Sequence, residues 1–157
     1  MVKKVLLTFV LCLVGLFVYA QEYTATSAGT GKKGEYLVNV TVSVKKKNDV
    51  KDAESLVKRC AVHAVLFRGL MSADSHSSQK PLIKDPNVEN VKAAFFQSFW
   101  NEGQFKNYTA LVGSSLMAMK NKQTKMHEVS ATVIVDKESL LKYMEGQGVI
   151  QGFSNLW

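Results

Sequence analysis

Residues 36–45 read YLVNVTVSVK, and this stretch decides the fold. Tyr36 and the valines at positions 38, 40, 42 and 44 alternate with mostly polar neighbours. A period of two in β-branched residues is typical of a strand with one face buried and the other in solvent. The stretch therefore predicts a half-buried β-strand.

Downstream of this strand the apolar spacing changes to three and four residues, which is the spacing of a helix. From Ala53 to Phe67 the apolar residues fall on one face, so we expect a helix that Asn48 or Asp49 caps and that Gly69 ends near Arg68.

A second helix is expected to begin at Asp85-Pro86, because Asp is a good N-cap and Pro suits the first helical position. It should continue to about Asn101. Its apolar stripe is formed by Val88, Val91, Phe95 and Phe99.

The last third of the chain predicts a β-hairpin and a helix. Strands at about 108–120 and 125–135 are joined by a polar turn at 121–124, and Asp136 caps a short helix that Gly146 and Gly148 end. The predicted order is β-α-α-β-β-α. This order favours an α+β fold with a three-stranded, antiparallel or mixed sheet and helices packed on one face.

The N-terminal region predicts export. Lys3 and Lys4, the apolar run Val5–Val18 and the small residue Ala20 are typical of a signal peptide over residues 1–20, cleaved before Gln21. Residues 21–35 are rich in Thr, Ser, Gly and Lys and are expected to be a flexible lead-in. Residues 36–157 then form a single α+β domain of ordinary size.

The position of Cys12 and the net charge indicate the compartment of the protein and the class of partner it would bind. Cys12 lies inside the apolar run without the Gly or Ala that precedes a lipidated cysteine, so we expect a periplasmic or secreted protein that is not a lipoprotein. The net charge is +7, and losing Lys3 and Lys4 leaves +5. Outside the cytoplasm this favours an anionic glycan or lipid, or only solubility, over nucleic acid.

No residue set predicts catalysis, a metal site or a cofactor. Cys60 and His63 share one helix face, yet a mid-helix cysteine on an apolar stripe is expected to be a buried core residue. The three histidines lack the spacing of metal ligands. The glycines at positions 29, 31 and 34 have no preceding strand or P-loop spacing.

Aromatic residues concentrate between positions 95 and 108. They cover more of the helix surface than one buried stripe does. Either the sheet of the same domain or a partner or ligand must cover the second face. The C-terminal tail also ends on an aromatic residue. The possible partner or ligand surface comprises Phe96, Trp100, Phe105, Tyr108 and Trp157.

Two segments carry a family resemblance. They are AVHAVLFRG at 61–69 and the strand 128–135 with the helix that follows. Over about residues 36–152 the chain resembles the dodecin-like α+β class of small envelope domains, seen in LPP20-type lipoproteins, flagellar assembly accessory proteins and the N-terminal domains of TolB-like proteins. The junction Tyr19-Ala20-Gln21 resembles leaders common in Bacteroidota.

The resemblance implies an assembly or accessory role and supplies no catalytic residues. This chain departs from the lipoprotein members because it lacks a lipobox, and residues 71–108 look like an insertion.

The sequence thus predicts an exported, non-enzymatic envelope assembly or accessory binding protein that contacts an envelope protein or itself through the aromatic helix and the tail. The alternative is a small periplasmic hydrolase or a glycan- or lipid-binding domain with a pocket between residues 71–86 and the aromatic helix. An exposed Trp100 or Trp157 would favour the first, and polar side chains converging in a pocket the second.

Overall fold

The computed structural model describes residues 22–45, 50, 52–72 and 78–151. The expected signal peptide at 1–20, the capping candidates Asn48 and Asp49, and Trp157 lie outside the described residues.

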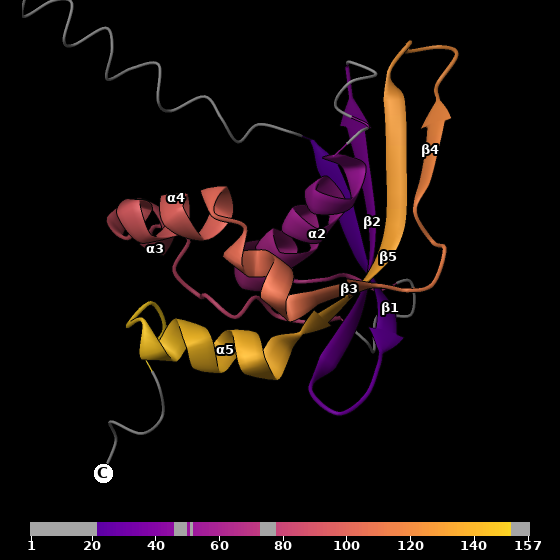
Figure 1. Ribbon diagram of the computed structural model, residues 1–157. Coiled ribbons are helices and arrows are strands. Elements are labelled where there is room, and N and C mark those ends of the chain that lie inside the picture. The colour runs from indigo at the N-terminus through magenta and orange to yellow at the C-terminus, as the bar shows by residue number, and fades with distance from the viewer. Residues whose placement is uncertain (1–21, 46–49, 51, 73–77, 152–157) are drawn as a thin grey trace, which may run out of the picture.

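The fold is α+β, with helices gathered on one side of an antiparallel sheet (Figure 1). The sheet has five strands in the order β1-β2-β5-β3, and β4 also pairs with β5. The strands are β1 (Tyr23–Thr30), β2 (Glu35–Val44), β3 (Thr109–Leu111), β4 (Met117–Lys120) and β5 (His127–Asp136). The expected class and one-sided arrangement are found, whereas the expected three-stranded sheet is wrong.

The expected flexible lead-in at 21–35 is wrong for the residues described, because Tyr23–Thr30 forms the edge strand β1. Tyr23 and Ala25 face Val42 and Val40 across the pairing with β2, on the core side. The connection to β2 ends at Gly34, whose φ of +87° favours glycine. The domain core therefore begins before residue 36.

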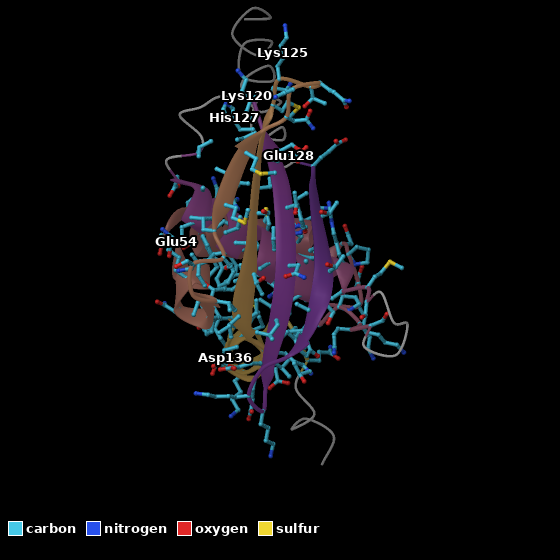
Figure 2. The ribbon with its side chains drawn as sticks, turned by 90° about the vertical axis from the view of Figure 1, so that its right-hand side faces the viewer. Glu54, Lys120, Lys125, His127, Glu128 and Asp136 are labelled. Atoms are coloured by element: carbon cyan, nitrogen blue, oxygen red, sulfur yellow. The ribbon has the colours of Figure 1, made fainter. Side chains whose placement is uncertain are left out.

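The strand at 36–45 is confirmed as β2, which lies between β1 and β5. Its four valines, Val38, Val40, Val42 and Val44, are essentially fully buried. Each such side chain contributes about 1.5 to 3 kcal/mol on burial. The opposite face is polar, and there Thr132 Oγ1 donates to Asn39 Oδ1 of the neighbouring strand. Figure 2 looks onto this open face.

The helix expected to end near Arg68 is confirmed. It comprises α2 (Ala53–His63) and a final π-helical turn, η3 (Ala64–Arg68). The apolar stripe of α2 packs on β2 and β5. Gly69 ends the helix with a φ of +74°, and a side chain there would collide with the backbone oxygen of Gln79.

The second expected helix is two helices, α3 (Val88–Val91) and α4 (Ala93–Asn101), which Lys92 separates with φ −104° and ψ 31°. The break shifts the helical phase, so the expected stripe is wrong in part. Val91 is 71% exposed, and Phe95 is only half-buried. Phe96, Phe99 and Trp100 form the buried face instead.

The hairpin turn at 121–124 is confirmed, since Asn121 Oδ1 accepts from the backbone N–H groups of Gln123 and Thr124. The strand expected at 108–120 is instead split into β3 and β4, which pair with different parts of β5. The 3₁₀ helix η4 (Gln104–Tyr108) precedes β3.

The last expected helix is α5 (Lys137–Gly146), and the Asp136 side chain caps it by accepting from the Ser139 N–H. In the part of the chain that the structure describes, no helix has the length and apolar character needed to cross a membrane.

Candidate functional site

The aromatic residues expected to form a partner surface lie mostly in the core. Phe96, Trp100 and Phe105 are 2%, 3% and 2% exposed, and Tyr108 is half-buried. Phe67 from the end of the first helix packs on Phe96, with ring centroids 5.2 Å apart. The domain itself therefore covers most of these rings, so they form no exposed surface for a protein partner, whereas Trp100 and Phe105 of the expected partner or ligand surface line a pocket.

Exposed apolar side chains gather on a different element. Leu116, Met117 and Met119 are exposed on or beside β4, which pairs only with β5. Met71 and Val91, which lie on other segments, are exposed as well.

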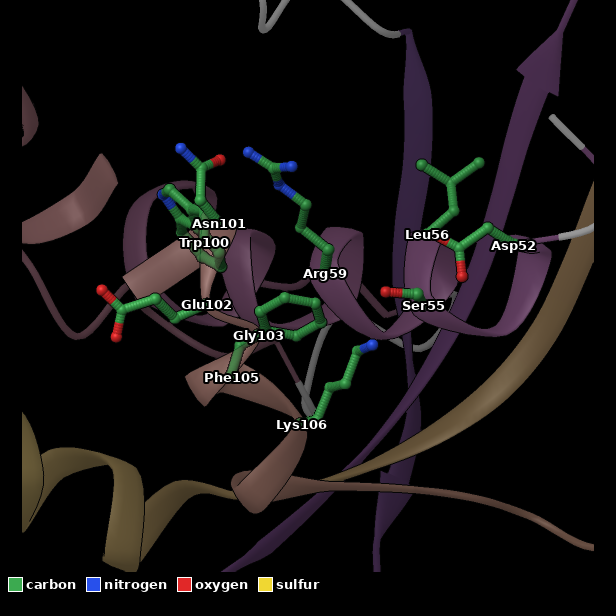
Figure 3. A pocket seen from close by; sticks show the side chains of 10 residues that line it. All are labelled: Asp52, Ser55, Leu56, Arg59, Trp100, Asn101, Glu102, Gly103, Phe105 and Lys106. Carbon is green, nitrogen blue, oxygen red and sulfur yellow. The ribbon is translucent and has the colours of Figure 1, made fainter. Parts of the chain in front are cut away.

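A pocket of about 560 Å³ opens between α2, the C-terminal end of α4 and η4 (Figure 3). It differs from the pocket expected beside residues 71–86, because α4 and η4 meet α2 at the other end of the aromatic helix. We call it the α2–η4 pocket. Its lining consists of Asp52, Ser55, Leu56, Arg59, Trp100, Asn101, Glu102, Gly103, Phe105 and Lys106.

Helix α2 supplies one wall of the α2–η4 pocket. Asp52 at the N-cap and Ser55, Leu56 and Arg59 within the helix lie on one side of its first two turns, since Asp52, Ser55 and Arg59 are spaced by three and four residues. This face adjoins the apolar stripe that packs on the sheet. The buried stripe therefore fixes the direction in which Ser55 and Arg59 point.

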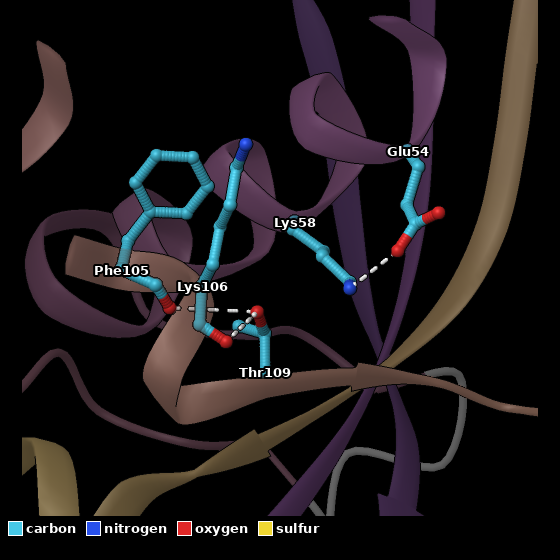
Figure 4. Close-up of polar contacts among 5 residues, drawn as sticks. All are labelled: Glu54, Lys58, Phe105, Lys106 and Thr109. Carbon is cyan, nitrogen blue, oxygen red and sulfur yellow. Dashed lines mark hydrogen bonds and ion pairs between the residues drawn. The ribbon is translucent and has the colours of Figure 1, made fainter. Parts of the chain in front are cut away.

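The opposite wall is η4, which several hydrogen bonds hold in place. The Thr109 hydroxyl donates to the backbone oxygens of Phe105 and Lys106 at 3.4 and 3.3 Å (Figure 4). Gly103 begins the turn with φ +73°, and its oxygen accepts from the Lys106 N–H. The position of Lys106 is thus set by backbone contacts, while its side chain is exposed.

Two cationic side chains line the α2–η4 pocket beside aromatic rings. The Arg59 guanidinium carbon lies 5.4 Å from the centre of the Trp100 ring, and Lys106 Nζ lies 6.0 Å from that of Phe105. Cation–π attraction of this kind holds Arg59 against a buried and immobile ring.

Acidic side chains lie near these cations. The charge of Arg59 acts on the carboxyl of Glu89, whose pKa burial raises, and the charge of Lys106 acts on Glu54, whose pKa its hydrogen bond to Lys58 lowers. Glu102 accepts from Ser98 Oγ and Gln104 Nε2, and these hydrogen bonds hold the pKa of its carboxyl below the ordinary value. Figure 3 shows its carboxylate turned away from Arg59 and Lys106. Glu54 accepts from Lys58 (Figure 4). Asp52, at the far end of the lining, is exposed.

Cys60 is buried as expected, and burial raises the pKa of its thiol to about 11. His63, its neighbour on the helix face, bonds elsewhere. Its Nδ1 forms a hydrogen bond with the Tyr23 hydroxyl at 2.6 Å, and its Nε2 lies 3.9 Å from Glu89 Oε2. Burial and the charges of Arg68 and Arg59 lower the pKa of His63 to about 4, so its ring is neutral at pH 7.

Within the described residues, no three His, Cys, Asp or Glu side chains lie close enough to hold a metal ion. His127 is half-buried at the start of β5, and His76 lies outside those residues.

No protein-family model, curated protein or solved structure matches the chain. The function is therefore inferred from the α2–η4 pocket and its surroundings.

Proposed function

We propose that this protein is an exported glycan- or lipid-binding domain of the cell envelope, the alternative that converging polar side chains and a buried Trp100 favour, and that it holds its ligand in the α2–η4 pocket. The convergence of polar side chains from α2 and η4 on a hollow of about 560 Å³ carries the proposal. This volume falls in the range of about 300 to 1,000 Å³ that is usual for small-ligand sites.

The chemistry of the α2–η4 pocket supports binding over catalysis. Its lining residues include neither histidine nor cysteine, so the Ser55 hydroxyl has no imidazole beside it to act as a base. A glycosidase would need a carboxyl with a raised pKa as its general acid, whereas the pKa of Glu102 in the pocket lining is lowered. A small periplasmic hydrolase thus remains the weaker alternative.

The expectation of export comes from the sequence. A basic n-region, an apolar run and Ala20 favour cleavage before Gln21. Partner contact through Phe96 and Trp100 loses support because both rings are buried, while the exposed methionines of β4 remain as a surface for an envelope protein or a second copy.

Nuclear magnetic resonance of ¹⁵N-labelled protein beginning at Gln21 tests the proposed pocket. The titrants are glucose, glucuronate, N-acetylglucosamine and glycerol phosphate. We expect at least one to shift the signals of Ser55, the Trp100 indole and Lys106, with those of Thr41 on the open sheet face unchanged. Shifts confined to other surfaces, or none at saturating concentration, would overturn the proposed site.

Export is tested separately by fractionating cells and measuring the intact mass of the protein. A periplasmic or secreted form that begins at Gln21 supports the proposal. An uncleaved chain in the cytoplasm contradicts it, whatever the α2–η4 pocket binds.

A further inference from the structure

The β4–β5 hairpin carries three exposed lysines at its tip. Lys120 ends β4, and Lys122 and Lys125 lie in the turn that follows. A backbone hydrogen bond from the Asn121 N–H to the Met126 oxygen closes this turn, so the three side chains leave the chain close together. Figure 2 shows Lys120 and Lys125 at the same end of the molecule. We call Lys120, Lys122 and Lys125 the lysine tip.

The backbone at Lys125 is strained. Its φ is +58°, and in the part of the chain that the structure describes it is the one residue other than glycine with a positive φ. Glycine and asparagine adopt this left-handed conformation at less cost than lysine does. A strained residue at a hairpin tip is a reason to look for a function of its side chain.

Few acidic side chains lie beside the lysine tip. Glu128 lies opposite the end of β4, and the Asn121 amide donates to its carboxylate at 2.9 Å. Glu22 directly precedes β1, so it lies beside Lys45 of β2 and about 14 Å from β4 across two intervening strands. Salt screens exposed charges at that distance. Among the described residues, no ion pair includes a lysine of the tip.

The same hairpin exposes apolar side chains. All four residues of β4 are exposed, and the strand stands apart from the helices in Figure 1. Met117 and Met119 lie on the open face of the sheet, because they pair with Ser130 and Glu128, which flank the buried Val129. The two methionines are 54% and 61% exposed. The hairpin therefore places apolar side chains directly beside a positively charged turn.

This combination fits a membrane surface better than the other possible partners. Lysines attract anionic lipid headgroups, and apolar side chains beside them can enter the boundary between headgroups and acyl chains. A soluble polyanionic glycan would neutralise the lysine tip but leave Met119 in water. A second copy would bring the same three positive charges to the interface.

We propose that the β4–β5 hairpin docks the protein on the surface of a membrane that contains anionic lipids, with the lysine tip at the headgroups and Met119 at the boundary with the acyl chains. None of the residues that line the α2–η4 pocket belongs to this hairpin. Docking is therefore a second binding function, which can be tested separately from the pocket.

Cosedimentation with lipid vesicles tests the docking surface, with protein that begins at Gln21. One set of vesicles is phosphatidylcholine alone, and the other contains about 30% phosphatidylglycerol to supply negative charge. We expect binding to the anionic vesicles to be much tighter than to the neutral ones. It should weaken as salt rises from about 20 to 300 mM, because the lysine tip is exposed to solvent.

Paired substitutions locate the contact. Lys122→Gln combined with Lys125→Gln should weaken binding to anionic vesicles about 25-fold, since each lysine near such a surface contributes about fivefold. Lys32→Gln combined with Lys33→Gln is the matched control. It makes the same charge change in the exposed β1–β2 turn, at the opposite end of the sheet, and should leave the affinity unchanged.

Met119→Ser tests the apolar contact at constant charge and should weaken vesicle binding severalfold. Circular dichroism checks that each variant is folded. Equal losses in the two lysine pairs, or equal binding to neutral and anionic vesicles, would overturn docking through the lysine tip. Full affinity of Met119→Ser, together with complete competition by soluble polygalacturonate, would indicate a glycan partner and overturn the membrane surface. None of these results changes the test of the α2–η4 pocket by nuclear magnetic resonance.

Discussion

Trp100 is the residue whose role the structure changes most. It was a candidate for an exposed surface, yet it contacts Phe96, Phe99 and Phe105 in the core and supports Arg59. Removing a buried tryptophan leaves a cavity, so Trp100→Ala should lower the free energy of unfolding by about 3 to 5 kcal/mol, measured by urea denaturation.

Val91→Ala is the control for Trp100→Ala, because Val91 is exposed on the short helix just before α4 and should contribute almost nothing. Light scattering on both variants completes the test. Unchanged stability of Trp100→Ala with a loss of oligomeric mass would place the ring at an interface instead.

His63 makes the stability depend on pH. Its pKa is about 4 in the folded protein and near 6.5 when exposed, so the unfolded chain takes up the proton first as the pH falls. The contribution of the neutral His63 to the free energy of unfolding is complete above pH 6.5 and is lost as the pH falls towards 4. The two pKa values correspond to a loss of about 3 kcal/mol between pH 7.5 and 4.

Urea unfolding at several pH values, compared between the wild type and His63→Gln, isolates this contribution. Glu89, whose pKa burial raises, acts in the opposite direction and is present in both proteins. We expect the difference between the two proteins to shrink towards low pH. A difference that stays constant from pH 7.5 to 4 would rule out the buried neutral histidine.

At the residue scale, the sequence predicts the features that depend on residues nearby in the chain, and it does not predict contacts between distant segments. Burial of Cys60 could be predicted because it lies on a helical apolar stripe. The bond between Tyr23 and His63 could not, because it joins an edge strand to a helix 40 residues away. The position of Arg59 over Trp100 could not be predicted either, because it joins α2 to α4.

At the element scale, local signals predicted β2, α2 and α5 well. Each combines a regular apolar period with a clear beginning or end, such as Gly69 or Asp136. The break at Lys92 was missed because that residue is compatible with a continuous helix. β1 was missed because its threonines, serine and alanines carry little apolar signal and become half-buried only beside β2.

The cap of α5 gives a prediction at this scale. Asp136 accepts from both the backbone N–H and the hydroxyl of Ser139. Asp136→Ala should therefore lower the free energy of unfolding by about 1 kcal/mol, measured by urea denaturation. Asp136→Asn is the matched control, since asparagine caps nearly as well. Equal losses in the two variants would show that the carboxylate charge, and not capping, stabilises the helix.

At the scale of the whole molecule, the α2–η4 pocket exists only because segments far apart in the sequence meet. Helix α2 packs on β2 and β5, and Trp100 of α4 lies beside Arg59 of α2. The 3₁₀ helix η4 follows α4 in the chain. A hollow of this kind has no signature in any one segment. The sequence therefore suggested a pocket beside the aromatic helix but placed it at the wrong end.

Removing the edge strand β1 tests whether it belongs to the folded domain, because a flexible lead-in could be removed without lowering the free energy of unfolding. Protein beginning at Glu35 would lose the cover that Tyr23 and Ala25 give to Val42 and Val40, and β2 would become an open edge. We expect the free energy of unfolding to fall by about 3 kcal/mol or more. Tyr23→Phe, which removes only the hydroxyl that is hydrogen-bonded to His63, should lower the free energy of unfolding by about 1 kcal/mol. An unchanged urea midpoint in the truncated protein would show that β1 contributes nothing to the core.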